Sequence, residues 1–144
     1  TRVFAVDVGH GQLAWKLRQD PRVIVMEKTN ARHLTPAQFP SPFSPVDLIV
    51  IDCSFISLRK ILPPAVALLR TPGRIVALIK PQFEAGREKV GKGGIVRDPD
   101  VHAEVVERIQ RVAAQLGWPA RSLIDSPILG AEGNKEFLVW LKTA

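Results

Sequence analysis

Four charged residues stand at the ends of apolar runs, and their types suit proton transfer. They are Asp7, Asp52, Lys80 and Glu136. Lys80 follows five apolar residues, 75–79, so its ammonium group would be partly buried near carboxylates, an environment that adapts a lysine to general acid or base work. A single charge at a strand end more often caps the strand in solvent, and Glu136 could simply pair with Lys135. Four such charges in one sheet favour a functional site.

A glycine pattern follows the first of these acids. Residues 9–14, GHGQLA, match G-x-G-x-x-G/A, and Glu27 ends the next apolar run, so the spacing fits an NAD-type dinucleotide-binding domain. However, Asp7 would place negative charge beside a pyrophosphate, and the same pattern occurs in plain turns between a strand and a helix. From the residues alone, both interpretations stay open.

A second glycine pattern lies at residues 86–93, GREKVGKG, and satisfies a P-loop up to its last position. That position must supply a hydroxyl to magnesium, but Gly93 stands there, and no helical pattern follows. A nucleoside triphosphatase is therefore not expected. The segment is either a solvated turn or a basic lid that touches phosphate.

Short β-branched runs alternate with helical patterns along the chain, which is typical of a parallel sheet with crossover helices. The predicted strands are Val3 to Val6, Val23 to Met26, Asp47 to Asp52, Arg74 to Lys80, Arg121 to Ser126 and Glu136 to Leu141. The first four are apolar on successive residues, as expected of strands buried on both faces. The fold class is therefore α/β.

The clearest helix opens at Asp98 and Pro99, a capping residue followed by a proline suited to the first helical position. It carries an apolar stripe and ends at Gly117. A second helical pattern starts at Leu58, and the pair of prolines at 63–64 should restart or kink it before residues 66–69. Residues 82–97 form a long loop after a strand's carboxyl end, where parallel sheets place their ligands.

Length and composition limit the other possibilities. The chain has 144 residues, enough for one domain, and its net charge of +6 suggests either a polyanionic partner or a merely solvated basic surface. One cysteine forms no internal disulfide, and the apolar runs are too short to span a membrane. We therefore expect a cytoplasmic protein with no membrane partner, and no residue pattern predicts a metal site.

Four ordered segments together resemble the TlyA family, historically called haemolysin A. They are residues 6–13 (VDVGHGQL), 52–57 (DCSFIS), 80–84 (KPQFE) and 90–98 (VGKGGIVRD), and the similarity spans nearly the whole chain. The family is similar to the FtsJ-type ribose 2′-O-methyltransferases, which use S-adenosylmethionine, and its characterised members methylate ribosomal RNA. The resemblance therefore implies an enzyme with S-adenosylmethionine as its methyl donor and ribosomal RNA or a ribosomal subunit as its partner.

The resemblance also implies a donor site. Asp7, followed by Val8, looks like the acid that holds the ribose hydroxyls of the donor, a task that suits a carboxylate accepting two hydroxyl protons. Thr29 and Asn30 fall where the family approaches adenine, and Asp52 also lies on the donor side.

A catalytic set follows from the same resemblance. Asp52, Lys80 and Glu136 look like the last three members of the family's Lys-Asp-Lys-Glu tetrad. In that interpretation Lys80 takes up or steers the proton of the ribose hydroxyl, while the two carboxylates set its charge and position.

The chain also departs from the family. From the resemblance, we expect residues 1–144 to start after the family's first strand, its glycine-rich donor loop and the first tetrad lysine, and not to include the N-terminal S4-like domain. We expect residues 1–144 to form one N-terminally truncated domain with a Rossmann-like methyltransferase fold, mostly parallel with an antiparallel last strand. Without the first strand, the family's order 3-2-1-4-5-7-6 separates into 3-2 and 4-5-7-6, and the exposed edges favour self-association. Such a fragment would be inactive alone, and a catalytically dead RNA-binding or interaction module of the same fold is the alternative.

Overall fold

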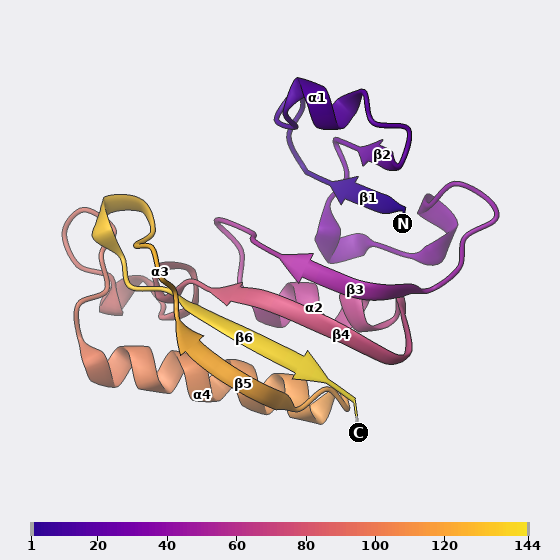
Figure 1. The fold of residues 1–144 in the computed structure, drawn as a ribbon. Coiled ribbons are helices and arrows are strands. Elements are labelled where there is room, and N and C mark those ends of the chain that lie inside the picture. The colour runs from indigo at the N-terminus through magenta and orange to yellow at the C-terminus, as the bar shows by residue number, and fades with distance from the viewer. Residues whose placement is uncertain (1, 144) are drawn as a thin grey trace. The chain divides into compact units, whose positions relative to one another are not determined.

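The computed structural model describes residues 2–143, which form two compact units, one ending at Phe43 and the other beginning at Ser44 (Figure 1). Each unit has its own sheet. Among residues 2–143, no helix has the length and apolar character needed to cross a membrane.

The first unit is built on two parallel strands, β1 (Val3–Val6) and β2 (Val23–Met26), which pair in register from Val3 opposite Val23. Both strands have the predicted bounds. The connection between them contains one helical turn, α1 (Trp15–Arg18), and two short 3₁₀ helices follow β2, η1 (Ala31–His33) and η2 (Pro36–Gln38). This unit therefore carries the first glycine pattern.

The second unit contains a four-stranded sheet in the order β3-β4-β6-β5. Its strands are β3 (Val46–Ile51), β4 (Leu69–Ile79), β5 (Ala120–Asp125) and β6 (Phe137–Lys142). β3 and β4 are parallel, whereas β6 runs antiparallel to both β4 and β5. The separation into a two-stranded and a four-stranded sheet, and the antiparallel last strand, confirm the predicted topology.

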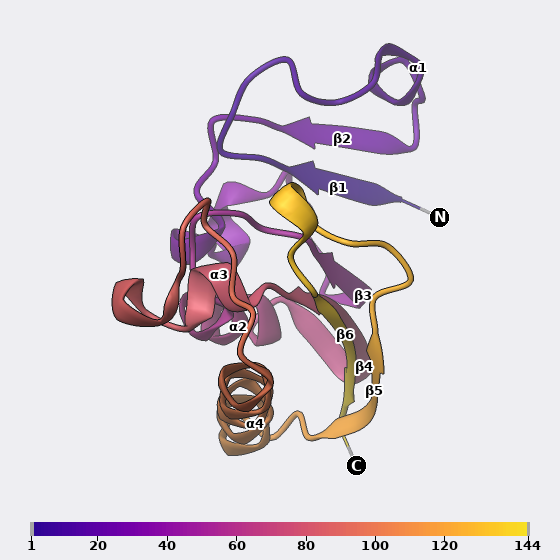
Figure 2. The same ribbon diagram turned by 90° about the vertical axis from the view of Figure 1, so that its left-hand side faces the viewer.

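Two helices cover one face of this sheet, α2 (Leu58–Val66) and α4 (Pro99–Gln115) (Figure 2). The core beneath them is fully buried and contains Ile75, Ile79, Ile109, Val139 and Leu141. Asp98 caps α4 as predicted, since its side chain accepts a hydrogen bond from the amide of Asp100 at 2.9 Å.

The opposite face is less covered than the sequence predicts. Val50 of β3 is 70% exposed, and the neighbouring Leu48 is 49% exposed. The prediction that β3 is buried on both faces is therefore wrong, because its apolar residues are alternately covered by the helices and open to solvent.

Two local predictions also differ from the structure. α2 continues through Pro63 and Pro64, whose missing amides would have bonded to the carbonyls of Arg59 and Lys60, two exposed residues that water can reach. The helix ends at Val66 and residues 67–69 do not extend it, because Leu69 begins β4 and pairs with Val46 of β3.

The loop predicted at residues 82–97 contains short elements of secondary structure. It contains a turn of helix, α3 (Pro81–Glu84), a 3₁₀ helix, η3 (Arg87–Lys89), and a bridge between Gly91 and Ile95. No helix begins at Gly93, so the second glycine pattern does not form a P-loop. A further 3₁₀ turn, η4 (Ala131–Gly133), precedes β6.

Candidate active site

Three of the candidate residues lie at one edge of the four-stranded sheet. Asp52 directly follows β3, Lys80 directly follows β4, and Glu136 directly precedes β6. Because β3 and β4 are parallel and β6 is antiparallel, these three positions meet at the same edge. The pairing of β4 with β6 ends with Ile79 opposite Phe137, so Lys80 directly follows and Glu136 directly precedes this last pair.

Lys80 joins the segments that follow β3 and β4. Its Nζ lies 2.6 Å from Oδ1 of Asp52 and donates a hydrogen bond to Oγ of Ser54 at 3.1 Å. The Lys80 side chain is only 13% exposed, whereas that of Asp52 is 66% exposed. The apolar stem is therefore buried, and the ammonium group is held at the surface by two oxygen partners.

Glu136 is buried, with 5% of its surface exposed, and its Oε1 accepts a hydrogen bond from Nε2 of Gln82 at 2.8 Å. Lys135 instead pairs with Asp125 at 2.8 Å, so the simple alternative of a pair between Lys135 and Glu136 is not adopted. The other amide atom of Gln82, Oε1, is buried, and residues 2–143 give it no hydrogen-bond partner.

Ser54 and Gln82 were not identified as site residues from the sequence. Each lies two residues beyond a candidate, Ser54 after Asp52 and Gln82 after Lys80. Both belong to segments that carry the family resemblance. Their position in these segments, close to a charged candidate residue, was the signal that could have identified them as site residues.

Four of the five candidate donor residues, Asp7, Val8, Thr29 and Asn30, belong to the first unit, whereas Asp52 belongs to the second. Oδ1 of Asp7 accepts the amide of Gly9 at 2.6 Å, and the Asp7 carbonyl accepts the amide of Thr29 at 3.0 Å. Asp7 also lines a pocket of about 150 Å³ together with Gln12 and Glu27. The backbone therefore brings Asp7 and Thr29 together next to this pocket.

Val8 and Asn30 take other positions in this unit. Val8 is 72% exposed, and Oδ1 of Asn30 accepts the amide of Arg32 at 3.0 Å, which caps η1. The Asn30 side chain thus has a local structural task in addition to any contact with a ligand.

Glu27 is engaged within the protein itself. Its carboxylate accepts the amide of Gly11 at 2.9 Å, lies 2.9 Å from Nδ1 of His10, and pairs with Arg18. The hydrogen bond from Arg18 is the main reason why the pKa of Glu27 is lowered. A carboxylate held in this way is poorly placed to bind a ribose, and α1, with four residues, lacks the helix that a dinucleotide fingerprint needs behind its glycines.

An α/β sheet with parallel strands, an antiparallel last strand and polar residues at the carboxyl edge defines a Rossmann-like methyltransferase fold. Comparison with known families leads to the same class. Residues 1–143 match the FtsJ-like methyltransferase family, and the chain belongs to that family. Solved methyltransferases with 13 to 16% sequence identity and TM-scores of 0.57 to 0.66 share the fold alone.

The chain is similar to several proteins over nearly all its residues. YqxC of Bacillus subtilis is 56% identical over 138 residues, which cover 96% of this chain and 48% of YqxC. The 16S/23S rRNA (cytidine-2′-O)-methyltransferase TlyA of Mycobacterium tuberculosis is 50% identical over 141 residues, which cover 98% of this chain and 52% of TlyA. A crystal structure of a Lactococcus lactis protein, 50% identical, matches with a TM-score of 0.93 over 99% of this chain and 67% of that chain.

These matches confirm the resemblance to the TlyA family. The chain spans about half the length of the curated relatives it matches.

Proposed function

We propose that this chain is the methyl-transfer region of a cytoplasmic enzyme that methylates ribose 2′-hydroxyls of ribosomal RNA with S-adenosylmethionine. In this proposal residues 1–144 are parts of one domain. The observation that carries it is the contact of Lys80 with Asp52 and Ser54, at the sheet edge where Glu136 also lies, in a chain of the FtsJ-like methyltransferase family.

The residues of the first unit fit the proposed donor. Asp7 uses Oδ1 for the amide of Gly9, which leaves its second carboxylate oxygen for a ribose hydroxyl at the edge of the pocket that Asp7 lines. When bound, the donor supplies an electrophilic methyl group on a positively charged sulfur. In the proposal Val8, Thr29 and Asn30 of the same unit also contribute to its binding site.

The catalytic task of the second unit is to prepare a poor nucleophile. The 2′-oxygen forms a bond to the methyl carbon, the bond between that carbon and sulfur breaks, and the hydroxyl proton must leave. In our proposal Lys80 holds the attacking oxygen through Nζ and steers this proton to solvent past the exposed carboxylate of Asp52. In the same proposal the buried carboxylate of Glu136 helps to set the charge and the position of the Lys80 ammonium group.

The experiment uses the protein at its full natural length, S-adenosylmethionine and ribosomal RNA. Digestion of the RNA to nucleosides and mass spectrometry should show 2′-O-methylated nucleosides, formed one for one with S-adenosylhomocysteine. Methyl groups on bases would contradict the proposed reaction. Binding of RNA with no methyl transfer and no donor binding would instead support the alternative of an inactive RNA-binding module.

A further inference from the structure

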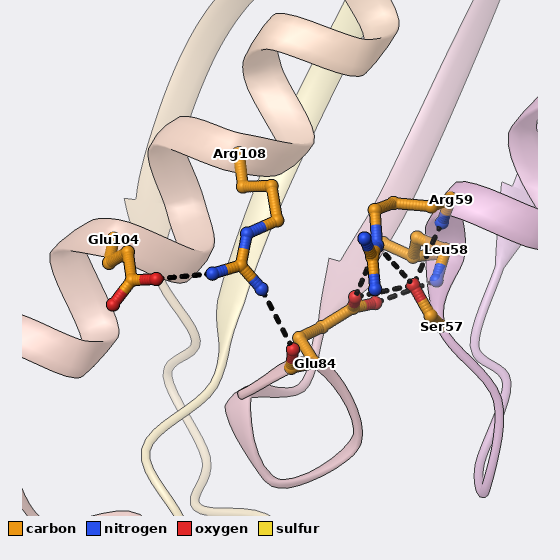
Figure 3. A network of polar contacts seen from close by, with 6 residues as sticks. All are labelled: Ser57, Leu58, Arg59, Glu84, Glu104 and Arg108. Carbon is orange, nitrogen blue, oxygen red and sulfur yellow. Dashed lines mark hydrogen bonds and ion pairs between the residues drawn. The ribbon is translucent and has the colours of Figure 1, made fainter. Parts of the chain in front are cut away.

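Glu84 is a buried acid to which neither the family resemblance nor the proposed chemistry assigns a role. It ends α3, four residues after Lys80, and is 5% exposed. Its Oε2 accepts the hydroxyl of Ser57 at 2.6 Å, and its Oε1 accepts the amide of Leu58 at 2.6 Å (Figure 3). Because Leu58 is the first residue of α2, the carboxylate caps a helix from another segment of the chain.

Two arginines, one on each of two helices, contact Glu84. Arg59 of α2 places its Nε 4.0 Å from Oε2 of Glu84, and Arg108 of α4 donates to the Glu84 backbone carbonyl at 3.1 Å. Arg108 also pairs with Glu104, which pairs with Lys89 (Figure 3 shows the pair of Arg108 with Glu104). The backbone and the side chain of Glu84 are therefore both fixed.

The two segments that Glu84 joins are the ones that carry the proposed catalytic pair. Residues 52–57 follow β3 and include Asp52, whereas residues 80–84 follow β4 and include Lys80. The other contacts between these segments are more exposed: Asp52 with Lys80, Ser54 with Lys80, and the rings of Phe55 and Phe83 at 5.0 Å, with Phe55 90% exposed.

Exposed ion pairs contribute little to structure because solvent screens them and their side chains lose entropy when fixed. A buried carboxylate with two short hydrogen bonds constrains its partners more strongly, because breaking either bond leaves a buried polar group unpaired. We propose that Glu84 is a positioning residue for methyl transfer, which sets the separation of the segments that carry Asp52 and Lys80. This inference rests on the function proposed above.

The test compares Glu84→Ala and Glu84→Gln with the wild type, using the protein at its full natural length. We measure kcat for methyl transfer and, by calorimetry, the dissociation constant and stoichiometry of S-adenosylmethionine. Glu84→Ala should lower kcat by about tenfold to hundredfold, because displacements near 1 Å have costs of this size, and should leave donor affinity within about twofold.

Glu84→Gln should restore kcat to within about threefold of the wild type. The amide oxygen can still accept the amide of Leu58, and the amide nitrogen can donate to Oγ of Ser57. Ser57→Ala removes one of the two hydrogen bonds and should give an intermediate kcat. It also provides the test if Glu84→Ala does not fold.

Val105→Ala is the matched control for a simple loss of stability. Val105 is 1% exposed on α4 and lies outside both segments. Val105→Ala should lower the melting temperature of the protein and leave kcat per donor-binding site unchanged.

Two results would overturn the inference while the proposed function stands: wild-type kcat in Glu84→Ala, or a loss of kcat in Val105→Ala as large as that in Glu84→Ala. A wild type that binds the donor and does not methylate RNA would instead overturn the proposed function, and the inference with it.

Discussion

Replacement of Gly130 by alanine is expected to force the Glu136 carboxylate out of its position. The backbone at Gly130 has φ −75° and ψ −172°, which alanine adopts without strain. A Cβ at this position, however, would overlap Oε1 and Cδ of Glu136 and lie 3.1 Å from its Cγ. The side chain of Glu136 is therefore the obstacle to the substitution.

The expected cost follows from the surroundings of Glu136. Oε1 of Glu136 must move by about 1.5 Å to restore an ordinary contact of ~3.5 Å. Glu136 is 5% exposed and hydrogen-bonded to Gln82, so it has little room to move. Insertion of a methyl group into a packed site costs about 1–3 kcal/mol in the free energy of unfolding. We expect Gly130→Ala to fall in this range.

The assay is urea unfolding in a double-mutant cycle with Glu136→Ala. That substitution removes each atom that the new Cβ would meet, so Gly130→Ala should cost less than about 0.5 kcal/mol in the Glu136→Ala background. An equal cost in both backgrounds would show that the clash with Glu136 is not the cause. A neutral effect in the native background would show that the carboxylate is not held where the structure places it.

Three further predictions concern the donor site, a buried acid and the sheet edges. Asp7→Ala should raise the dissociation constant of S-adenosylmethionine about tenfold in calorimetry, since charge-assisted hydrogen bonds contribute about 1.5–3 kcal/mol, and an unchanged constant would remove Asp7 from the site. Burial raises the pKa of Glu84 above its ordinary value of 4.5, so the folded chain holds this proton more tightly than the unfolded chain. The free energy of unfolding of the wild type, relative to that of Glu84→Gln, should therefore be greatest below the unfolded pKa of Glu84 and should decline as the pH rises through its folded pKa. Urea unfolding of both proteins between about pH 4 and pH 8 measures this difference. A difference that does not change with pH would contradict the prediction. Residues 1–144 alone should either self-associate, as measured by sedimentation, or show weak amide protection in β1 and β3 by hydrogen exchange, because each of these strands pairs with one neighbouring strand. A stable monomer with strong amide protection in both strands would contradict this prediction.

The elements of the sheet could be predicted from the sequence because their signals are local. β1 and β2 have the predicted bounds, and the Asp98 and Pro99 pair marked the start of α4. The end of α2 could not be predicted, because the apolar residues 66–69 suit a helix as well as a strand and the pairing of Leu69 with Val46 decides between them.

The site was predictable to a lesser degree. The strand ends and the antiparallel direction of β6 put Lys80 and Glu136 at the same edge of the sheet, and this placement follows from the order and direction of the strands. The partners Ser54 and Gln82 depend on the loops after β3 and β4, whose course is set by tertiary contacts and not by a periodic pattern.

For the glycine pattern at residues 9–14, the sequence alone could not decide between a dinucleotide site and a plain turn. Its spacing allowed a dinucleotide site, but the contacts of Glu27 with Gly11, His10 and Arg18 depend on side-chain packing that spacing does not encode.

In the proposed mechanism Lys80 acts in the chemical step of methyl transfer, so Lys80→Ala should slow this step. Lys60→Ala is the matched control, since Lys60 is exposed on α2 and outside the site. For the protein at its full natural length, single-turnover methylation of ribosomal RNA and donor affinity are measured on the same preparation. We predict that Lys80→Ala lowers the rate by about 10²-fold or more with donor affinity within about twofold, while Lys60→Ala retains the wild-type rate. A wild-type rate in Lys80→Ala would contradict the mechanism.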